Sequence, residues 1–254
     1  MLEYIKKIRR HWLRLRFGSR GLTRYVNGTR LQIHPDYRWY FAATHDKEVA
    51  EYFRSRIVPG SNCLSVGANI GIYPLQMASW IGEKGKVFAF EPNPNSANAM
   101  RQHIQLNHLE SRIEVFETAV SNETGKVTFS VAGTDGMSRI GSANPLIEND
   151  FNSIEVPVTT IDDFCEKASA MPTVLMMDIE GFEIAALKGS EHFFRSAADV
   201  VAVVEMHPND WENAGTTAED LKIFLDRNQL KMVPLTGQRD SYRDYGHVAL
   251  ERLA

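Results

Sequence analysis

Short apolar runs alternate with amphipathic stretches through most of this sequence. Runs long enough for a strand lie at 62–66, 86–90, 113–117, 173–177 and 199–206. Residues with helical spacing follow at 71–81, 94–107, 181–195 and 217–228. Strands that alternate with helices need crossover connections and form parallel sheets. The pattern therefore predicts an α/β fold with a mostly parallel sheet and helices on both faces.

Two patterns precede this alternation. Residues 24–33 alternate apolar and polar positions around Asn27 and Gly28, which predicts a β-hairpin because both central residues tolerate positive φ. Residues 47–57 have helical spacing, with Asp46 as the expected N-cap. We expect an N-terminal extension over residues 1–45 and a main domain over residues 46–254.

Further strands are expected around an irregular insertion and at the end of the chain. Two extra strands, at 125–133 and within 152–164, enclose the aperiodic segment 133–151. Long irregular insertions in compact domains are usually functional or disordered. Residues 229–235 and 246–253 predict a closing antiparallel pair.

Positive charge is concentrated at the N-terminus. Residues 1–24 hold eight Lys or Arg and one acid, whereas the whole chain has a net charge of -4. Apolar residues recur there at steps of three or four, which indicates a basic amphipathic helix: Met1, Ile5, Ile8, Trp12 and Leu15. Such a helix can lie on an anionic membrane surface, or it can pack on the protein body or on a second subunit. Both alternatives stay open at this point.

The remaining composition is that of an ordinary globular protein. The 43% hydrophobic and 24% charged residues argue against disorder. We find no run that could span a bilayer and no secretory pattern, so we expect a cytoplasmic protein, with the inner membrane face as an open location. The acidic main body argues against a nucleic-acid partner. Cys63 and Cys165 lack metal-ligand spacing and are expected to be reduced and structural.

A glycine-containing turn follows the first strand of the alternating region. Gly67, Ala68, Asn69 and Gly71 come directly after 62–66, and Glu91 ends the next strand 20 positions after Gly71. A glycine turn lets the backbone approach a nucleoside, and an acid at this distance can bind ribose hydroxyls. A pyrophosphate-binding turn needs another glycine where Asn69 stands. We therefore expect a nucleoside without a phosphate, of which S-adenosylmethionine is the common example.

Several motifs occur in an order that resembles one known family. They are VPGSNCLSVGANIG, VFAFEPNP, VPVTTIDDF, MMDIEGFEIAALKGS and VVEMHP, from about Glu48 to His207. Together they resemble the FkbM-type S-adenosylmethionine-dependent methyltransferases, which have the class I methyltransferase fold. The resemblance implies a Rossmann-like seven-stranded sheet whose last strand is antiparallel. It also implies methyl transfer to a hydroxyl of a sugar, glycan or secondary metabolite.

The resemblance also implies which residues bind the cofactor, and it shows two departures from the family pattern. The expected cofactor-binding residues are Gly67, Ala68, Asn69, Gly71, Glu91, Pro92, Thr118, Ala119 and Asp178. The family usually carries an acid two positions before the first glycine of the turn, and this chain has Ser65 there. The family also usually carries a lysine two positions before the acid that corresponds to Asp178, and this chain has Met176 there. These departures touch cofactor affinity and acceptor choice more than the reaction class.

Carboxylates and a histidine follow the fourth and fifth strands. Asp178 and Glu180 end one strand, and Glu205 and His207 end the next. Carboxyl ends of parallel strands meet at one edge, so these side chains should converge where the methyl group is transferred. We expect His207 as general base, with a carboxylate to orient it, and Asp178 and Glu180 as further catalytic residues. Asp178, Glu180 and His207 could instead bind a divalent cation.

The acceptor side of the site is the least defined. Glu48 and the segment from Gly133 to Asn152 are expected to form its wall, with Arg139 as a group that could bind an anionic or hydroxyl-rich acceptor. Two alternatives to hydroxyl transfer remain: an inactive nucleoside-binding module and an N-methyltransferase. The partner is expected to be a small molecule or a glycan, and homo-oligomer formation is left open.

Overall fold

The computed structural model describes residues 11–131, 139–140, 152–168, 171–196 and 199–253. Its main sheet has the strand order β12-β13-β11-β10-β3-β4-β5. The strands are β3 (Cys63–Val66), β4 (Val87–Phe90), β5 (Ile113–Phe116), β10 (Val174–Met177), β11 (Val201–Met206), β12 (Leu230–Pro234) and β13 (Gly246–Arg252). Only β13 pairs antiparallel with its neighbours, and the other pairs are parallel. The predicted sheet, including its antiparallel last strand, is confirmed.

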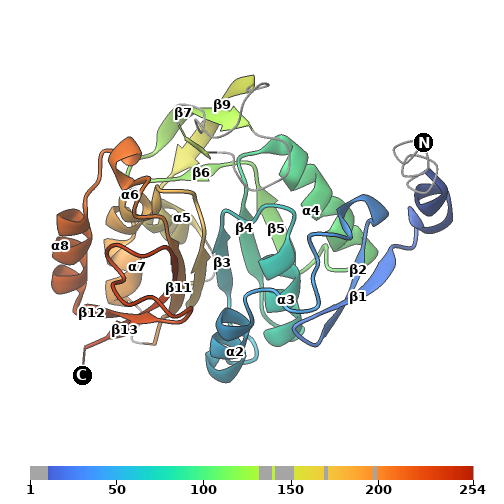
Figure 1. Ribbon diagram of the computed structural model, residues 1–254, viewed down its shortest axis with the longest axis horizontal. Coiled ribbons are helices and arrows are strands. Elements are labelled where there is room, and N and C mark those ends of the chain that lie inside the picture. Colours follow the sequence, from blue (N-terminus) through green and yellow to red (C-terminus); the bar gives the residue numbers. More distant parts are fainter. Residues whose placement is uncertain (1–10, 132–138, 141–151, 169–170, 197–198, 254) are drawn as a thin grey trace.

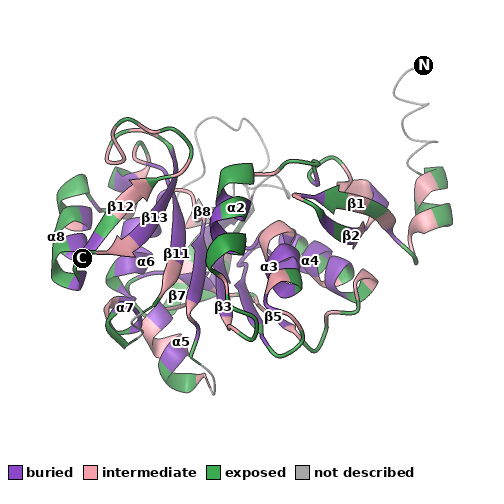
Figure 2. Cartoon of the chain, turned by 90° about the horizontal axis from the view of Figure 1, so that it is seen from below, coloured by how far each residue is buried: buried purple, intermediate pink, exposed green. Residues whose placement is uncertain are grey.

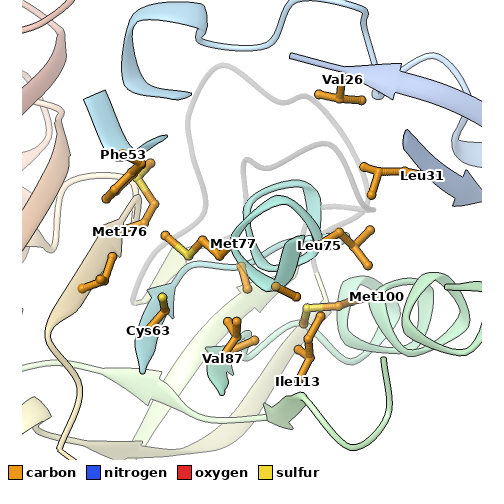
Figure 3. Packing of buried hydrophobic residues seen from close by; sticks show 14 of the residues in the cluster. Val26, Leu31, Phe53, Cys63, Leu75, Met77, Val87, Met100, Ile113 and Met176 are labelled. Atoms are coloured by element: carbon orange, nitrogen blue, oxygen red, sulfur yellow. The ribbon is translucent and has the colours of Figure 1, made fainter. Parts of the chain in front are cut away.

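Helices cover both faces of this sheet, as predicted (Figures 1 and 2). One face packs against α2 (Lys47–Arg56), α3 (Ile72–Trp80) and α4 (Pro94–Leu106). The other packs against α5 (Ile161–Lys167), α6 (Glu183–Lys188), α7 (Glu191–Ser196) and α8 (Ala218–Asn228). Figure 3 shows the first core, where Leu75 and Met77 of α3 and Met100 of α4 lie near Cys63 and Val87 of the sheet.

The N-terminal hairpin is confirmed and belongs to the same core. β1 (Leu22–Val26) and β2 (Thr29–Ile33) pair antiparallel around Asn27 and Gly28, whose φ angles are 48° and 81°. Val26 and Leu31 are buried with the residues of α3 and α4 (Figure 3). A short 3-10 helix, η1 (Pro35–Tyr37), follows. The domain boundary at residue 45 stays a prediction.

The structure describes only part of the predicted basic helix. Residues 11–17 are helical, and the three earlier members of the apolar stripe lie outside the described residues. Trp12 is 51% exposed and Leu15 76% exposed. None of the helices that the structure describes has the length and apolar character needed to cross a membrane.

A second, smaller sheet has the order β6-β9-β7-β8 and lies at the top of Figure 1. Its strands are β6 (Ala119–Val120), β7 (Gly125–Val131), β8 (Arg139–Ile140) and β9 (Asn152–Thr159). The two strands predicted here are confirmed. The prediction of an irregular insertion is wrong at β8, where Ile140 pairs with Phe129. The rest of the predicted acceptor wall, 132–138 and 141–151, lies outside the described residues.

Two local predictions are wrong. The single helix expected at 181–195 is two helices, because the chain breaks at Gly189 and Ser190 and the carboxylate of Asp162 accepts N–H groups at the start of α7. Asp46 precedes α2 but has a φ of 43° and forms no side-chain cap. Its carboxylate instead accepts the hydroxyl of Tyr73 at 2.8 Å.

Candidate active site

The turn after β3 places its backbone against the ends of two neighbouring strands. Gly67 has a φ of 77°, and a Cβ there would overlap the carbonyl oxygen of Asp178, so only glycine fits. Asn69 has a φ of 46°, and its N–H donates to Oε2 of Glu91 at 2.7 Å. The other oxygen of Glu91 accepts the N–H of Asn93 at 2.8 Å. Glu91 therefore ties the turn to the start of α4.

A cavity that is partly open to solvent lies beside this turn. It contains most of the residues expected to bind the cofactor: Gly67, Asn69, Glu91, Pro92, Thr118, Ala119 and Asp178. Ala68 and Gly71 do not line it. Ala68 is buried in the core, and Gly71 precedes α3, where a Cβ would lie 2.8 Å from Cγ of Met100. The cofactor roles of all nine residues stay predictions.

Asp178 and Glu180 lie in the turn that follows β10 and also line the cavity. The turn reverses sharply, with φ angles of 52° at Glu180 and 101° at Gly181. Both side chains are partly exposed, at 34% for Asp178 and 30% for Glu180. The two carboxylates can therefore reach a molecule bound in the cavity.

His207, which follows β11, faces these carboxylates. Its Nε2 lies 3.6 Å from Oε2 of Glu180 and 4.0 Å from Oδ1 of Asp178. Its Nδ1–H donates to Oε1 of Glu183 at 2.9 Å. Glu183 is fully buried at the start of α6 and also accepts the indole N–H of Trp211 at 3.1 Å. The structure thus brings the three predicted catalytic residues together, and their roles stay predictions.

The neighbouring carboxylates change the pKa of His207, and the pKa values of Asp178 and Glu180 are also shifted. Burial alone lowers the pKa of His207, but its hydrogen bond to Glu183 and the charges of Glu183, Asp178 and Glu180 raise that pKa to about 10. Burial and the charge of Glu205 raise the pKa of Asp178 well above its usual range. Burial also raises the pKa of Glu180. His207 therefore carries a proton at neutral pH in the cofactor-free protein.

Further polar residues surround Asp178. The hydroxyl of Tyr245 donates to Glu205, and Nε2 of His247 lies 3.5 Å from the same carboxylate. The ring of Tyr245 lies 5.2 Å from that of His207, centroid to centroid. None of these three residues lines the cavity, and Glu205 and His247 are buried. Glu48 is exposed on α2, and the side chain of Arg139 lies outside the described residues.

Sequence reasoning missed Glu183, Tyr245 and His247. Glu183 had one signal, because it is an acid inside the otherwise apolar helical run FEIAAL. His247 had none, because it lies opposite Glu205 only through the antiparallel register of β11 and β13. Register between strands so distant in the chain is not visible in a single sequence.

The two departures from the family pattern lie side by side. Ser65 of β3 and Met176 of β10 are register partners on adjacent strands, and each is 1% exposed. Neither lines the cavity. Met176 packs in the core with Cys63 and Phe53 (Figure 3). An acid and a lysine at these positions would form one buried pair, so the two changes remove that pair together.

This sheet order, the glycine turn and the acid after β4 define a class I methyltransferase fold. The sequence matches the methyltransferase FkbM domain over residues 65–232, about two thirds of the chain. The chain therefore belongs to the FkbM methyltransferase family.

Two curated relatives and one solved structure are similar to it. Hexuronic acid methyltransferase AglP of Haloferax volcanii is 25% identical over 168 residues, which cover 65% of this chain and 61% of the relative. The 2-O-methyltransferase NoeI of Sinorhizobium fredii is 27% identical over 146 residues, covering 52% and 58%. The chain thus spans about three fifths of each relative. Methyltransferase FkbM from Methylobacillus flagellatus KT has a TM-score of 0.52 at 19% identity, covering 77% of this chain and 44% of that chain, which shows the fold alone.

S-adenosylmethionine is the cofactor of this family, and the cavity fits it. Glu91 is 6% exposed and lines the cavity, as the predicted contact of its carboxylate with ribose hydroxyls requires. Oδ1 of Asn69 and Oδ1 of Asp178 are buried and have no hydrogen-bond partner among the described residues, so both can accept hydrogen bonds from a ligand. Apolar side chains from the small sheet, Phe129 and Ile140, complete the lining.

Proposed function

We propose that this protein transfers the methyl group of S-adenosylmethionine to a hydroxyl of a sugar or glycan. The observation that carries the proposal is the position of Asp178 and Glu180. They line the cavity that contains Glu91, and they also face His207. A methyl acceptor must approach the sulfonium at such a junction between a nucleoside site and groups that can take a proton.

The reaction needs alignment and removal of one proton. The acceptor oxygen bonds to the methyl carbon, the carbon–sulfur bond breaks, and its electron pair stays on sulfur. His207 can accept the hydroxyl proton only after it has lost its own. Positive charge on a cofactor held in the cavity would favour that loss, since Asp178 and Glu180 line the cavity and also face His207. Glu183 then orients the neutral imidazole through Nδ1.

The charge of the site favours an acceptor without an acidic group. The cavity lining contains Glu91, Asp178 and Glu180, and it contains no lysine or arginine among the described residues. A carboxylate on the acceptor would be repelled there, whereas neutral hydroxyls can donate to the acids. The name of AglP, a hexuronic acid methyltransferase, supports a carbohydrate acceptor, although a hexuronic acid carries the acidic group that this lining disfavours. The name of NoeI, a 2-O-methyltransferase, supports transfer to an oxygen atom.

The same acidic lining gives a specific reason to keep an amine acceptor as the second candidate. A protonated amine would be attracted to Asp178 and Glu180, although it must lose a proton before it can react. The third alternative, an inactive nucleoside-binding module, is weakened by the position of Ser65 and Met176, since both lie in the core and outside the cavity.

The experiment measures S-adenosylhomocysteine release by the purified chain with neutral sugars, uronic acids and amino sugars. We expect turnover with a neutral sugar, and a loss of at least about 100-fold in kcat for His207→Gln with cofactor affinity retained. Glu212→Gln is the control, because Glu212 is exposed on η2 (Trp211–Ala214) outside the cavity. Turnover only with amino sugars would indicate N-methylation. Cofactor binding without turnover on any acceptor would contradict the enzyme proposal.

A further inference from the structure

Two side chains that line the cavity and a histidine that faces them are arranged as a ligand set for a metal ion. Asp178, Glu180 and His207 each offer one donor atom, and these three atoms all lie within 4.8 Å of one another. The residues follow β10 and β11, which are parallel neighbours, so the sheet itself holds the donors together. Around an ion with bonds of about 2.1 Å, adjacent ligands lie about 3 Å apart. Shifts of roughly 1 Å or less would close the set.

The state of His207 independently indicates a ligand. The side chain is 9% exposed, and its Nδ1–H donates to the buried carboxylate of Glu183. Its Nε2 has no hydrogen bond among the described residues and faces Asp178 and Glu180 at 4.0 and 3.6 Å. Metal-binding histidines almost always donate their other N–H to a carboxylate or carbonyl in this way, which leaves the free nitrogen for the metal.

Asp178 also has a possible ligand atom without a hydrogen-bond partner. Its Oδ1 is buried and has no hydrogen-bond partner among the described residues. Buried carboxylate oxygens are normally paired with a donor or a cation, because leaving them unpaired is costly. Nε2 of His207, which faces this oxygen, is 4.0 Å away and too far for a hydrogen bond.

Acidic side chains outnumber basic ones around these donor atoms. Four carboxylates meet here, from Asp178, Glu180, Glu183 and Glu205, and within the described part of the chain they form ion pairs only with the imidazoles of His207 and His247. The cavity lining provides no lysine or arginine among the described residues. A divalent cation would balance two of the negative charges.

We infer that Asp178, Glu180 and His207 bind a divalent first-row transition metal ion. Two carboxylate oxygens and one imidazole suit Mn²⁺, Fe²⁺ or Zn²⁺ better than Ca²⁺ or Mg²⁺, which prefer oxygen ligands alone. Glu183 is then a positioning residue, which acts through His207.

The role of the ion rests on the proposed function. The ion binds the acceptor hydroxyl and lowers its pKa, so that the proton can pass to a carboxylate oxygen that the ion does not use, and then to solvent. The acceptor oxygen attacks the methyl carbon, and sulfur leaves with the bonding electrons. In this arrangement the ion activates the hydroxyl and a carboxylate takes its proton, so His207 acts as a ligand of the ion and not as the general base that the sequence assigned to it.

The test is titration of the chelator-treated, full chain with Mn²⁺, followed by the loss of the electron paramagnetic resonance signal of the free ion. We expect one bound ion per chain, with affinity reduced at least about 10-fold in Glu180→Gln and in His207→Ala. Glu212→Gln, outside the cluster, should bind as the wild type does. Circular dichroism checks that each variant is folded. Absence of Mn²⁺ binding, or equal binding by folded Glu180→Gln, would overturn the inference.

A second measurement separates this inference from the proposed function. Turnover should fall after chelation and return when Mn²⁺ is added. Methyl transfer at an unchanged kcat after chelation would overturn the metal site and leave the proposed function standing. Mn²⁺ binding that depends on Glu180 and His207, without transfer to any acceptor, would instead support the site and contradict the proposed function.

Discussion

Replacing Glu91 by Gln tests the cofactor site and the electrostatics of the fold together. Burial raises the pKa of Glu91 from 4.5 to about 7, although two backbone N–H groups stabilise its carboxylate. The side chain is 6% exposed, so solvent screens it little. One pKa unit corresponds to about 1.4 kcal/mol, and the ionised carboxylate therefore costs the folded protein about 3 kcal/mol above pH 7.

The effect on stability has a defined sign. Between pH 4.5 and 7 the folded protein binds more protons at Glu91 than the unfolded protein does, so its free energy of unfolding falls as the pH rises through this window. Glu91→Gln lacks this dependence. It also leaves a buried N–H opposite an amide donor, which costs about 1–3 kcal/mol at every pH. Between pH 4.5 and pH 8, the free energy of unfolding of the variant should therefore rise by about 3 kcal/mol relative to that of the wild type. Urea unfolding of the cofactor-free proteins measures this difference.

Cofactor affinity should change with pH in the opposite direction. In the predicted contact, ribose hydroxyls donate to the ionised carboxylate, and with a pKa of about 7 only about a tenth of Glu91 is ionised at pH 6. The dissociation constant measured by titration calorimetry should then be about 10-fold weaker at pH 6 than at pH 8.5. Glu91→Gln should bind the cofactor weakly and without this pH dependence. Glu114 is an exposed acid on β5, and Glu114→Gln should behave as the wild type. Parallel pH curves for the wild type and Glu91→Gln would refute the reasoning.

Three further predictions follow. Gly67→Ala should lower the free energy of unfolding by at least about 3 kcal/mol, because its Cβ meets backbone, whereas Gly82→Ala, also at positive φ but in open space, should cost about 1–2 kcal/mol in a parallel urea titration. Ser65→Asp and Met176→Lys should each cost about 3–5 kcal/mol, and the double variant should recover about 0.5–3 kcal/mol; strictly additive losses would contradict the pairing. If the basic N-terminal segment binds membranes, which is one of the alternatives left open by the sequence, Trp12→Ala should reduce sedimentation with anionic vesicles; equal sedimentation of both proteins would argue against this contact.

Local signals were sufficient for most of the fold. Asn27 and Gly28 specify a hairpin through their own tolerance of positive φ, and the buried strands are visible as unbroken apolar runs. The errors occurred where distant residues decide the local structure. Asp162 accepts N–H groups of α7 across 30 positions of the chain, and this contact helps to divide a continuous helical pattern at Gly189. β8 is a strand because Ile140 pairs with Phe129 of β7, and the periodicity of apolar residues along the chain does not indicate this pairing.

The residues of the site also fall into two groups, those that local spacing predicts and those that depend on contacts between distant segments. The position of Gly67 and Glu91 beside one cavity was predictable, because a nucleoside turn and its acid have a fixed spacing along one strand–helix–strand unit. Glu183 was not predictable as the partner of His207, since that contact joins α6 to the end of β11 across 24 positions and depends on how the helix packs. Fold resemblance indicates the nucleoside half of the site, and the acceptor half has to be established from packing.

The position of Ser65 and Met176 shows how strand register changes the meaning of a sequence difference. Taken separately, a missing acid and a missing lysine suggest two losses at a catalytic site. As register partners on β3 and β10, with 1% exposure each, they are one change in the interior of the sheet. Replacing a buried ion pair with side chains that need no partner is often neutral or stabilising. The carboxylates that do line the cavity, at Glu91, Asp178 and Glu180, are all retained, so the features that support methyl transfer do not depend on the pair that was lost.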